Sequence, residues 1–187
     1  PPDSWVLVGA GDIADCTTTD DDRTGAMVKA LLDRQPRARA FVAGDNAYPA
    51  GTPSDYQRCY LPTWGAFADR TIAAPGNHDW LTDNAAGFRQ TFGVAADAPL
   101  YRSEDVGPWR VIVVDSDCAA SGACQAGSVQ LHWLADELAA HQRVCTLVIA
   151  HHPRFSSGHH GPSLPHQPLW ETLVAGGADV LINGHDH

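Results

Sequence analysis

The stretch Ala40-Phe41-Val42-Ala43-Gly44-Asp45-Asn46-Ala47-Tyr48 decides the fold that we expect for this chain. The apolar residues 40–43 predict a short buried strand, which Gly44 ends. Asp45 and Tyr48 then follow at the carboxyl end of that strand, where α/β proteins build their functional sites. Our hypothesis is that Asp45 bridges two metal ions and that Tyr48 ligates one of them.

The size and charge of the chain limit the kind of protein that it can be. Its 187 residues, 44% of them hydrophobic, suit one domain spanning 1–187 with room for a sizeable core. No apolar run approaches the roughly 20 residues that a membrane-spanning helix needs. The formal net charge of −10, from 22 acidic and 12 basic side chains, argues against a nucleic-acid partner. An acidic protein that acts on an anion needs bound cations to reverse the field locally.

Apolar runs and helical spacings on either side of residues 40–43 predict alternating strands and helices. Strands are predicted at residues 5–8, 40–43, 71–74, 100–102, 109–114, 144–150 and 180–182. Helices are predicted around Met27, Val28, Leu31 and Leu32, at residues 85–92, after the N-cap Ser128 with Leu131, Leu134, Ala135, Leu138 and Ala139, and at residues 168–175. The succession of strand, helix and strand in residues 5–43 predicts a parallel βαβ unit.

Five of the predicted strands are followed by a polar cluster. The clusters are Asp12; Asp45 with Tyr48; Asn77 with His78; His151; and His185 with His187. Parallel strands of one sheet bring their carboxyl ends to one edge, so we expect the five clusters to converge there.

The side chains in these clusters suit two transition-metal ions. Structural zinc takes four thiolate-rich ligands, whereas calcium and magnesium prefer oxygen ligands alone. Carboxylate, amide, phenol and imidazole groups together are too many for one tetrahedral ion, and two ions that share one carboxylate accommodate them. Two ions about 3.5–4 Å apart form a common clamp for in-line displacement at phosphorus.

The order of the clusters resembles the signature of the calcineurin-like metallophosphoesterases, and the tyrosine resembles their purple acid phosphatase branch. The matching pieces are Gly11-Asp12-Ile13-Ala14, Gly44-Asp45-Asn46-Ala47-Tyr48, Gly76-Asn77-His78-Asp79, Val148-Ile149-Ala150-His151 and Gly184-His185-Asp186-His187. The resemblance covers almost the whole chain. It implies the α/β fold of that family, a four-layer α/β/β/α sandwich.

The resemblance also implies a role for each site residue. The first metal, similar to the ferric site of that branch, would be Fe(III) held by Asp12, Asp45, Tyr48 and His187. The second metal, a divalent ion of Zn, Fe or Mn, would be held by Asp45, Asn77, His151 and His185. Asn77 and His78 resemble the residues that contact substrate beside the leaving group. His159 and His160 fall where the branch places a substrate-binding histidine, which implies a catalytic role for His78, His159 and His160.

Two features depart from the family pattern. The wider superfamily begins with Asp-x-His, whereas Ala14 stands at the third position of this motif. Tyr48 replaces the missing ligand, so Ala14 and Tyr48 support each other. The family also continues past the GHxH motif with further strands, whereas this chain ends at His187. We therefore expect a fold truncated after that motif and less than full activity from residues 1–187 alone.

These assignments predict a phosphoric ester hydrolase, with acid phosphomonoesterase activity as the leading hypothesis. The resemblance implies a metal-bound hydroxide as nucleophile and a small phosphate ester as substrate, with no nucleic-acid or membrane partner. Two alternatives stay open. One is phosphodiester cleavage, of cyclic nucleotides or phospholipid headgroups. The other is a metal-binding domain without turnover.

The five cysteines bear on the cellular compartment. Cys118 and Cys124 flank a small loop, and Cys16 and Cys59 both lie in loops, so each pair could form a disulfide; the alternative leaves all five free. Cys145 opens an apolar run and is expected as a buried free thiol. Two disulfides would indicate an oxidising compartment. The start at Pro1 rather than Met fits a removed export signal or a trimmed chain, and we expect an extracellular or periplasmic protein.

Several residues near the clusters are expected to have supporting roles. Asp79 is expected to orient a neighbouring histidine. His152 is expected to be a structural neighbour of the site, and Asp115 and Asp117 to form loop hydrogen bonds. Surface or packing roles are expected for His132, Trp80, Trp133 and Trp170.

Overall fold

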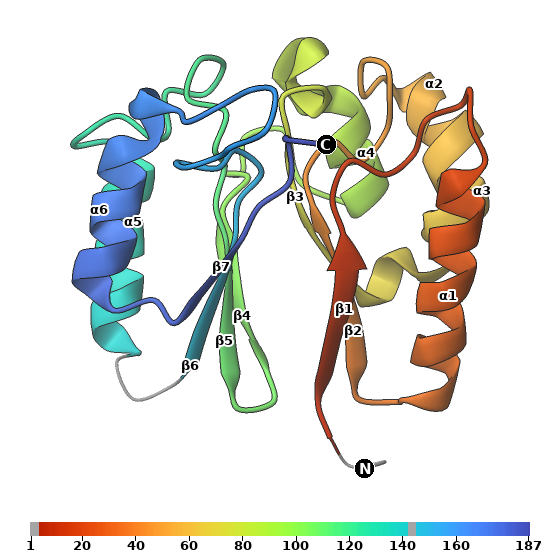
Figure 1. Cartoon of the computed structure of the whole chain (residues 1–187), viewed down its shortest axis with the longest axis horizontal. Helices are drawn as coiled ribbons and strands as arrows, with labels where there is room; N and C mark the ends of the chain where they lie inside the picture. The colour runs from red at the N-terminus through yellow and green to blue at the C-terminus, as the bar shows by residue number, and fades with distance from the viewer. Residues whose placement is uncertain (1–3, 142–144) are drawn as a thin grey trace.

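Two β-sheets stand face to face at the centre of the molecule, and helices cover their outer faces (Figure 1). The computed structural model describes residues 4–141 and 145–187. The arrangement of helix, sheet, sheet and helix layers confirms the predicted four-layer α/β/β/α architecture. None of the helices in the described ranges has both the length and the apolar composition to cross a bilayer.

The first sheet has three parallel strands in the order β1-β2-β3. They are β1 (Val6–Ala10), β2 (Ala38–Ala43) and β3 (Thr71–Ala74). Helix α1 (Asp20–Arg34) connects β1 to β2, which gives the parallel βαβ unit that the sequence predicts.

The second sheet has four strands in the order β4-β5-β6-β7. They are β4 (Arg102–Val106), β5 (Trp109–Val113), β6 (Cys145–Ile149) and β7 (Val180–Ile182). β4 pairs antiparallel with β5, and the other pairs are parallel. The predicted strand at 100–102 is wrong in position, because Leu100 is buried in a core cluster before the strand begins. Val144, predicted to open the strand now seen as β6, lies outside the described residues.

The helices pack their apolar side chains against the outer faces of the two sheets. Besides α1, they are α2 (Pro53–Asp55), α3 (Leu61–Thr63), α4 (Ala86–Phe92), α5 (Val129–Ala140) and α6 (Gln167–Gly176). Ser128 caps α5 as predicted, because its side chain accepts a hydrogen bond from the Leu131 amide at 3.2 Å.

Two of the predicted helical faces are narrower than expected. Leu131, Leu134 and Leu138 are buried, whereas Ala135 and Ala139 are exposed, so the apolar face of α5 is a single leucine stripe. On α1, Val28 is buried and Met27 is 73% exposed, so Met27 does not belong to the core.

Apolar side chains fill the space between the two sheets. Phe41, Ala43, Ile72 and Ala74 from the first sheet form one cluster with Val106, Val111, Val113 and Ile149 from the second. Each sheet is buried on both faces, by the other sheet on its inner face and by helices on its outer face. Most strand residues are therefore apolar whichever face they point to. This packing joins the two sheets into one unit and fixes the position of their strand ends relative to each other.

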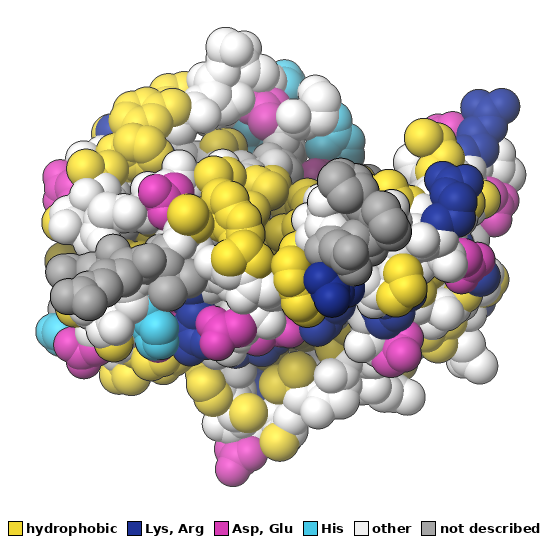
Figure 2. All heavy atoms as spheres, turned by 90° about the horizontal axis from the view of Figure 1, so that it is seen from below, with side chains coloured by type: hydrophobic (Ala, Val, Ile, Leu, Met, Phe, Trp, Pro, Cys, Tyr) yellow, Lys and Arg dark blue, Asp and Glu magenta, His cyan; other side chains and the backbone are white. Residues whose placement is uncertain are grey.

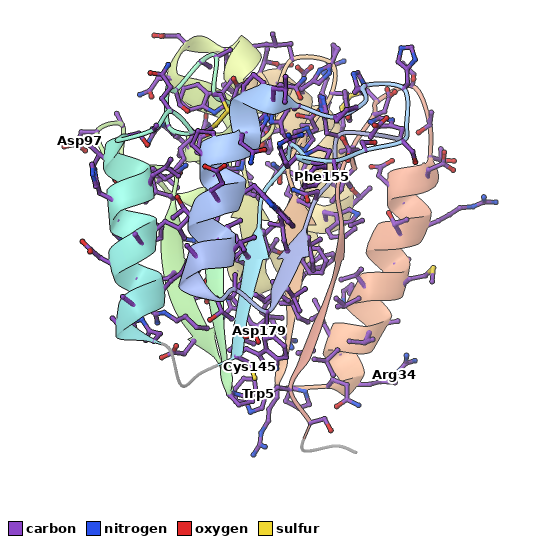
Figure 3. The ribbon with its side chains drawn as sticks, turned by 60° about the vertical axis from the view of Figure 1, so that its left-hand side comes forward. Trp5, Arg34, Asp97, Cys145, Phe155 and Asp179 are labelled. Atoms are coloured by element: carbon purple, nitrogen blue, oxygen red, sulfur yellow. A yellow bond between two sulfur atoms is a disulfide. The ribbon has the colours of Figure 1, made fainter. Side chains whose placement is uncertain are left out.

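The disulfide Cys16–Cys59 links the loop after β1 to the π-helical turn Tyr56–Tyr60, so the expectation that Cys59 lies in a loop is wrong. The disulfide Cys118–Cys124 closes the small loop between these two cysteines. The prediction for Cys145 is half wrong: it is a free thiol, but it is exposed. Cys145 is the first residue of β6 and lies with Trp5 at the end of the sheets away from Phe155 (Figure 3). Figure 2 shows this end, where hydrophobic side chains gather between charged ones.

Candidate metal centre

The five polar clusters converge, but they do so between two sheets rather than along one. Asp12, Asp45 and Asn77 follow β1, β2 and β3 of the first sheet, while His151 and His185 follow β6 and β7 of the second. The expectation of a single sheet edge is therefore wrong. An open cavity of 320 Å³ lies at the meeting point. It is lined by Asp45, Tyr48, Asn77, His78, His159, His160, His185, Asp186 and His187.

Short backbone contacts hold the strand ends together. The Asp12 amide donates to the Gly44 carbonyl at 3.0 Å, and the Ile13 amide donates to the Asp45 carbonyl at 3.1 Å. Gly44 has φ +84°, and a Cβ at this position would meet the His151 ring at 2.5 Å. Only glycine fits between the β2 loop and the imidazole.

Three of the expected metal ligands have left-handed backbones. The φ angles of Asp12, Asp45 and His185 are 55°, 49° and 73°. Non-glycine residues rarely adopt this region, and such strain is concentrated at functional sites. The surrounding hydrogen bonds hold it in place: the His185 amide, for example, donates to Asp12 Oδ2 at 2.9 Å.

The first half of the centre gathers around the Tyr48 hydroxyl. This oxygen lies 3.1 Å from Asp12 Oδ1, 3.2 Å from Asp45 Oδ2 and 3.1 Å from His187 Nε2. His187 Nε2 is itself 3.2 Å from Asp12 Oδ1. One hydroxyl proton cannot serve all these contacts, whereas a cation among the four groups would satisfy every lone pair.

The second half of the centre gathers around His151, which is fully buried. Its Nδ1 lies 2.8 Å from the Ala43 carbonyl, so this nitrogen carries the proton and donates it. Nε2 then faces Asp45 Oδ2 at 3.3 Å, Asn77 Oδ1 at 3.1 Å and His185 Nδ1 at 3.3 Å. Burial opposes a second proton on this ring, but the hydrogen bond to Asp45 and the charge of that carboxylate raise the pKa of His151. A bound cation would take the place of this proton on Nε2. A histidine fixed by a backbone carbonyl, with its other nitrogen aimed at oxygens, is the usual state of a metal ligand.

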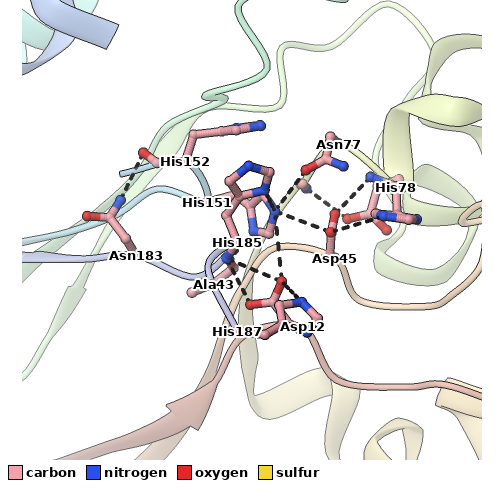
Figure 4. A network of polar contacts seen from close by, with 12 residues as sticks. Asp12, Ala43, Asp45, Asn77, His78, His151, His152, Asn183, His185 and His187 are labelled. Atoms are coloured by element: carbon pink, nitrogen blue, oxygen red, sulfur yellow. Dashed lines mark hydrogen bonds and ion pairs between the residues drawn. The ribbon is translucent and has the colours of Figure 1, made fainter. Parts of the chain in front are cut away.

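Asp45 joins the two halves (Figure 4). Its Oδ2 lies close to both the Tyr48 hydroxyl and His151 Nε2, and its Oδ1 accepts a hydrogen bond from the His78 amide at 2.8 Å. The residue is 2% exposed. The carboxylate therefore adjoins both halves of the donor set, and this set fits a dinuclear centre.

The charges of the site also call for a cation. Burial works against ionisation of Asp45, but the hydrogen bond and charge of His151 hold its pKa below the ordinary value. Burial and the charges of Asp45 and Asp12 raise the pKa of Tyr48 well above the ordinary range. Tyr48 therefore stays protonated unless a metal ion counters the two carboxylates, because a bound cation inverts the local pKa shifts.

The three histidines expected to contact substrate all line the cavity. His78 Nδ1 lies 2.5 Å from the Pro49 carbonyl, and His78 Nε2 lies 3.9 Å from Asp45 Oδ2. His159 and His160 are exposed, and the His160 ring lies 4.3 Å from the His185 ring. The geometry thus places His78 on one side of the cavity and the 159–160 pair on the other.

The expected role of Asp79 is wrong. Its buried carboxylate accepts hydrogen bonds from the Tyr56 hydroxyl at 2.7 Å, the Asn46 side-chain amide at 2.9 Å and the Gly76 amide at 2.9 Å, and none of these is a histidine. Burial raises its pKa to about 6. Asp79 ties the loop after β2 to the loop after β3, and so fixes Asp45 relative to Asn77.

The other neighbours behave as expected. His152 stacks on His166 and lies near Ser116 Oγ, and burial lowers its pKa to about 2, so it stays neutral. Asp115 accepts from the Trp80 indole, and Asp117 accepts from backbone amides of its own loop. His132 is exposed, and Trp80, Trp133 and Trp170 pack against aromatic or core side chains.

Sequence reasoning missed Asp186 and Asn46 as parts of the site. Asn46 donates to Asp79 and to the Ala74 carbonyl. Asp186 hydrogen-bonds to the loop that carries His159 and His160. For Asp186 the available signal was a carboxylate placed between two expected ligands. Nothing in its spacing indicated which loop it holds.

The fold and the convergent ligand set define a class of metal-dependent phosphoesterases. The sequence profile of the calcineurin-like phosphoesterase family matches residues 7–187, and the chain belongs to this family. It is 27% identical over 147 residues to the cAMP/cGMP dual specificity phosphodiesterase of Mycobacterium tuberculosis, in a match that covers 73% of this chain and 43% of that protein. This chain thus spans less than half the length of that relative.

Two solved structures share the fold. A purple acid phosphatase from yellow lupin (Lupinus luteus) seeds matches with a TM-score of 0.72 and 18% identity, over 99% of this chain and 38% of the lupin chain. GAP50, described as the anchor in the inner membrane complex of Plasmodium, matches with a TM-score of 0.70 and 16% identity, over 97% of this chain and 66% of that chain. At these identities the likeness concerns the fold alone.

Proposed function

We propose that this chain is the catalytic domain, over residues 1–187, of a dinuclear metal-dependent hydrolase that prefers phosphomonoesters. The observation that carries the proposal is the position of Asp45, whose Oδ2 lies 3.2 Å from the Tyr48 hydroxyl and 3.3 Å from His151 Nε2. One buried carboxylate thus adjoins both halves of the ligand set.

Each half of the centre would hold one ion. Asp12, Asp45, Tyr48 and His187 would hold the first, and Asp45, Asn77, His151 and His185 the second. When bound, the two ions supply Lewis acidity to the phosphoryl oxygens and a water of lowered pKa. The chain's own residues would bind the substrate and orient its phosphate group toward that centre.

Tyr48 supports Fe(III) as the first ion and a divalent ion of Zn, Fe or Mn as the second. Ala14 is fully buried, and its carbonyl accepts from the Tyr48 amide at 2.7 Å, so the two residues are neighbours at the site. In our proposal the phenol supplies the ligand that a histidine at position 14 would otherwise contribute. A phenolate ligand to a ferric ion would give the protein a purple or pink colour.

The histidines around the cavity support a substrate with a terminal phosphate. His78, on a backbone fixed by Asp45, would contact a phosphate oxygen or donate a proton to the departing alkoxide. Asn77 would contact substrate beside it. His159 and His160 would supply further hydrogen bonds from the opposite side, and the cavity of 320 Å³ admits a small ester.

Phosphodiester cleavage is the second candidate, because the Mycobacterium tuberculosis relative is a cyclic-nucleotide phosphodiesterase. Hydrolysis of p-nitrophenyl phosphate and of its bis ester at equal metal loading separates the two. Faster turnover of the monoester supports our proposal, and faster turnover of the diester overturns the monoester preference. Absence of p-nitrophenol release from either ester, with two ions bound, would instead identify a metal-binding domain without turnover.

We further propose an extracellular or periplasmic location. The two disulfides support it, because such bonds persist in oxidising compartments. Mass spectrometry of the protein as isolated from its native cell fraction would test the location and the disulfide state together. The partner that we propose is the small phosphate ester, with no nucleic acid or membrane.

A further inference from the structure

We propose that Asp186 is a positioning residue that holds His160, and with it His159, against the metal centre. Asp186 lies between the expected ligands His185 and His187, so this proposal rests on the function proposed above. It adds a specificity-determining contact, because the Asp186 carboxylate fixes the loop whose histidines would bind the phosphate group.

Both oxygens of the Asp186 carboxylate are used by the loop at residues 156–160. The Ser156 hydroxyl donates to Oδ2, and the His160 amide donates to Oδ1 at 3.2 Å. The Gly158 amide donates in turn to Ser156 Oγ at 2.9 Å. The carboxylate thus acts as a cap for the loop, rather than as a further ligand of the centre.

Gly158 makes this cap possible. A Cβ at residue 158 would lie 2.6 Å from Asp186 Oδ2 and closer still to Oδ1 and Cγ of the same carboxylate. Real Cβ atoms do not approach a carboxylate so closely, so any other side chain would push the loop and Asp186 apart. The close approach requires the absence of a side chain at this position.

The cap determines where the two imidazoles lie. The His160 ring lies 4.3 Å from the His185 ring with an interplanar angle of 32°, and the His159 ring lies 5.4 Å from the His160 ring. His159 and His160 are both exposed, so little packing holds them. Asp186 is itself fixed, because its amide donates to the Gly184 carbonyl at 2.9 Å. The segment that carries two expected metal ligands therefore also places the substrate-binding wall.

The test uses the metal-loaded chain with the variants Asp186→Ala, Gly158→Ala and the double variant. Ser157→Ala is the matched control, because Ser157 is an exposed neighbour in the same loop. Three quantities are measured: hydrogen exchange of the amides at residues 156–160, the Kd of inorganic phosphate by calorimetry, and kcat and KM for p-nitrophenyl phosphate. Bound metal is counted in each variant.

We expect Asp186→Ala and Gly158→Ala each to speed exchange at His160 and to raise both the Kd of phosphate and the KM about tenfold, the effect of about one lost hydrogen bond to a charged group. We expect kcat to fall less than about threefold and two ions to stay bound. Because both changes break the same contact, the double variant should be no worse than Asp186→Ala. Asp186→Asn keeps Oδ1 as an acceptor for the His160 amide and should restore part of the affinity. Ser157→Ala should behave as the wild type.

Unchanged exchange at residues 156–160 in Asp186→Ala would overturn the proposal, and so would faster exchange without any loss of phosphate affinity. Strictly additive effects in the double variant would also contradict it. If the wild type hydrolysed neither ester, the proposed function would fail. Exchange and phosphate binding would still decide the role of Asp186, so the two failures are distinguishable.

Discussion

The two walls of the metal centre differ in how they are held. The buried wall consists of Asp45, Asp79 and His151, which are 2%, 0% and 0% exposed. The exposed wall consists of His159 and His160, whose side chains are both exposed. Main-chain groups fix the buried wall at several points, such as Ala43 for His151 and His78 for Asp45. The exposed wall depends on the Asp186 carboxylate, which accepts hydrogen bonds from the Ser156 hydroxyl and the His160 amide.

This difference suggests that the two walls have different functions. The residues of the buried wall, which we propose adjoin the two ions, lie in the interior, where each polar atom needs a hydrogen-bond partner. The residues of the exposed wall, which we propose contact the substrate, lie in water, and we propose that the Asp186 carboxylate orders them. The buried wall should therefore control whether metal binds, and the exposed wall how tightly substrate binds.

The largest effect is expected from removing a ligand atom of the buried wall. His151→Asn keeps an N–H close to the Ala43 carbonyl but removes Nε2, so one ion should be lost. We expect kcat/KM to fall by about 10³-fold or more, on the order of 4 kcal/mol of transition-state stabilisation. Metal counting and steady-state kinetics check this.

His132→Asn is the matched control for this variant, because His132 is an exposed residue of α5 that does not line the cavity. It should keep wild-type metal content and activity. Full activity in His151→Asn would break the distinction between the two walls.

The next largest effect is on the pH dependence of stability, and it comes from the buried carboxylate of Asp115. Burial raises the pKa of Asp115 from 3.8 to about 6, although hydrogen bonds from its neighbours oppose this shift. The folded state then binds the proton more tightly than the unfolded chain does. The stabilisation is complete below about pH 4 and is lost as the pH rises through about 6. We expect the wild type to lose about 3 kcal/mol from this residue over that range.

Asp115→Asn isolates this contribution in urea unfolding at pH 4 to 8. Asparagine keeps Oδ1 as the acceptor for the Trp80 indole and the Asp117 amide, but it does not titrate. The difference in unfolding free energy between variant and wild type should grow in favour of the variant with rising pH. A constant difference would show that Asp115 has no raised pKa.

A smaller effect is expected from the exposed wall. His160→Ala should raise the KM for p-nitrophenyl phosphate about tenfold, because a hydrogen bond to a charged group is lost, and leave two ions bound. Loss of an ion from this variant would mean that the walls are not separate. Metal counting beside the kinetics distinguishes the two results.

The smallest effect is expected for His159→Ala. The His159 ring is exposed and contacts His160 rather than an expected metal ligand. Because His159 reaches the centre only through the His160 ring, we expect a change of about twofold in kcat/KM, roughly 0.4 kcal/mol. A loss comparable to that of His160→Ala would make His159 an equal partner in substrate binding.

The buried wall could be predicted from the sequence to a much greater extent than the exposed one. Apolar runs located most strands, and the polar residue after each run located Asp45, Asn77 and His151. This works because a buried strand must be apolar and must end where polar groups begin. The predicted position of β4 was wrong. Leu100 is apolar because it packs into a core cluster ahead of the strand, and no local pattern reveals this tertiary contact.

Contacts between the two sheets could not be predicted. Strand order and sheet membership depend on packing between distant segments, so local patterns suggest that the loops after β1 and β7 converge but do not determine how. The same limit explains the errors for Asp79, whose partners are Tyr56 and Gly76, and for Cys145, whose exposure depends on where β6 begins. The link from Asp186 to His160 spans 26 positions and joins two loops without periodic pattern.

Metal counting on Asp45→Ala tests the central claim most directly. The wild type, loaded and dialysed, should retain two ions per chain. Asp45→Ala, shown by circular dichroism to be folded, should retain none, because one carboxylate adjoins both halves of the centre. Retention of one ion by the folded variant would contradict the bridging role of Asp45 and the dinuclear centre that depends on it.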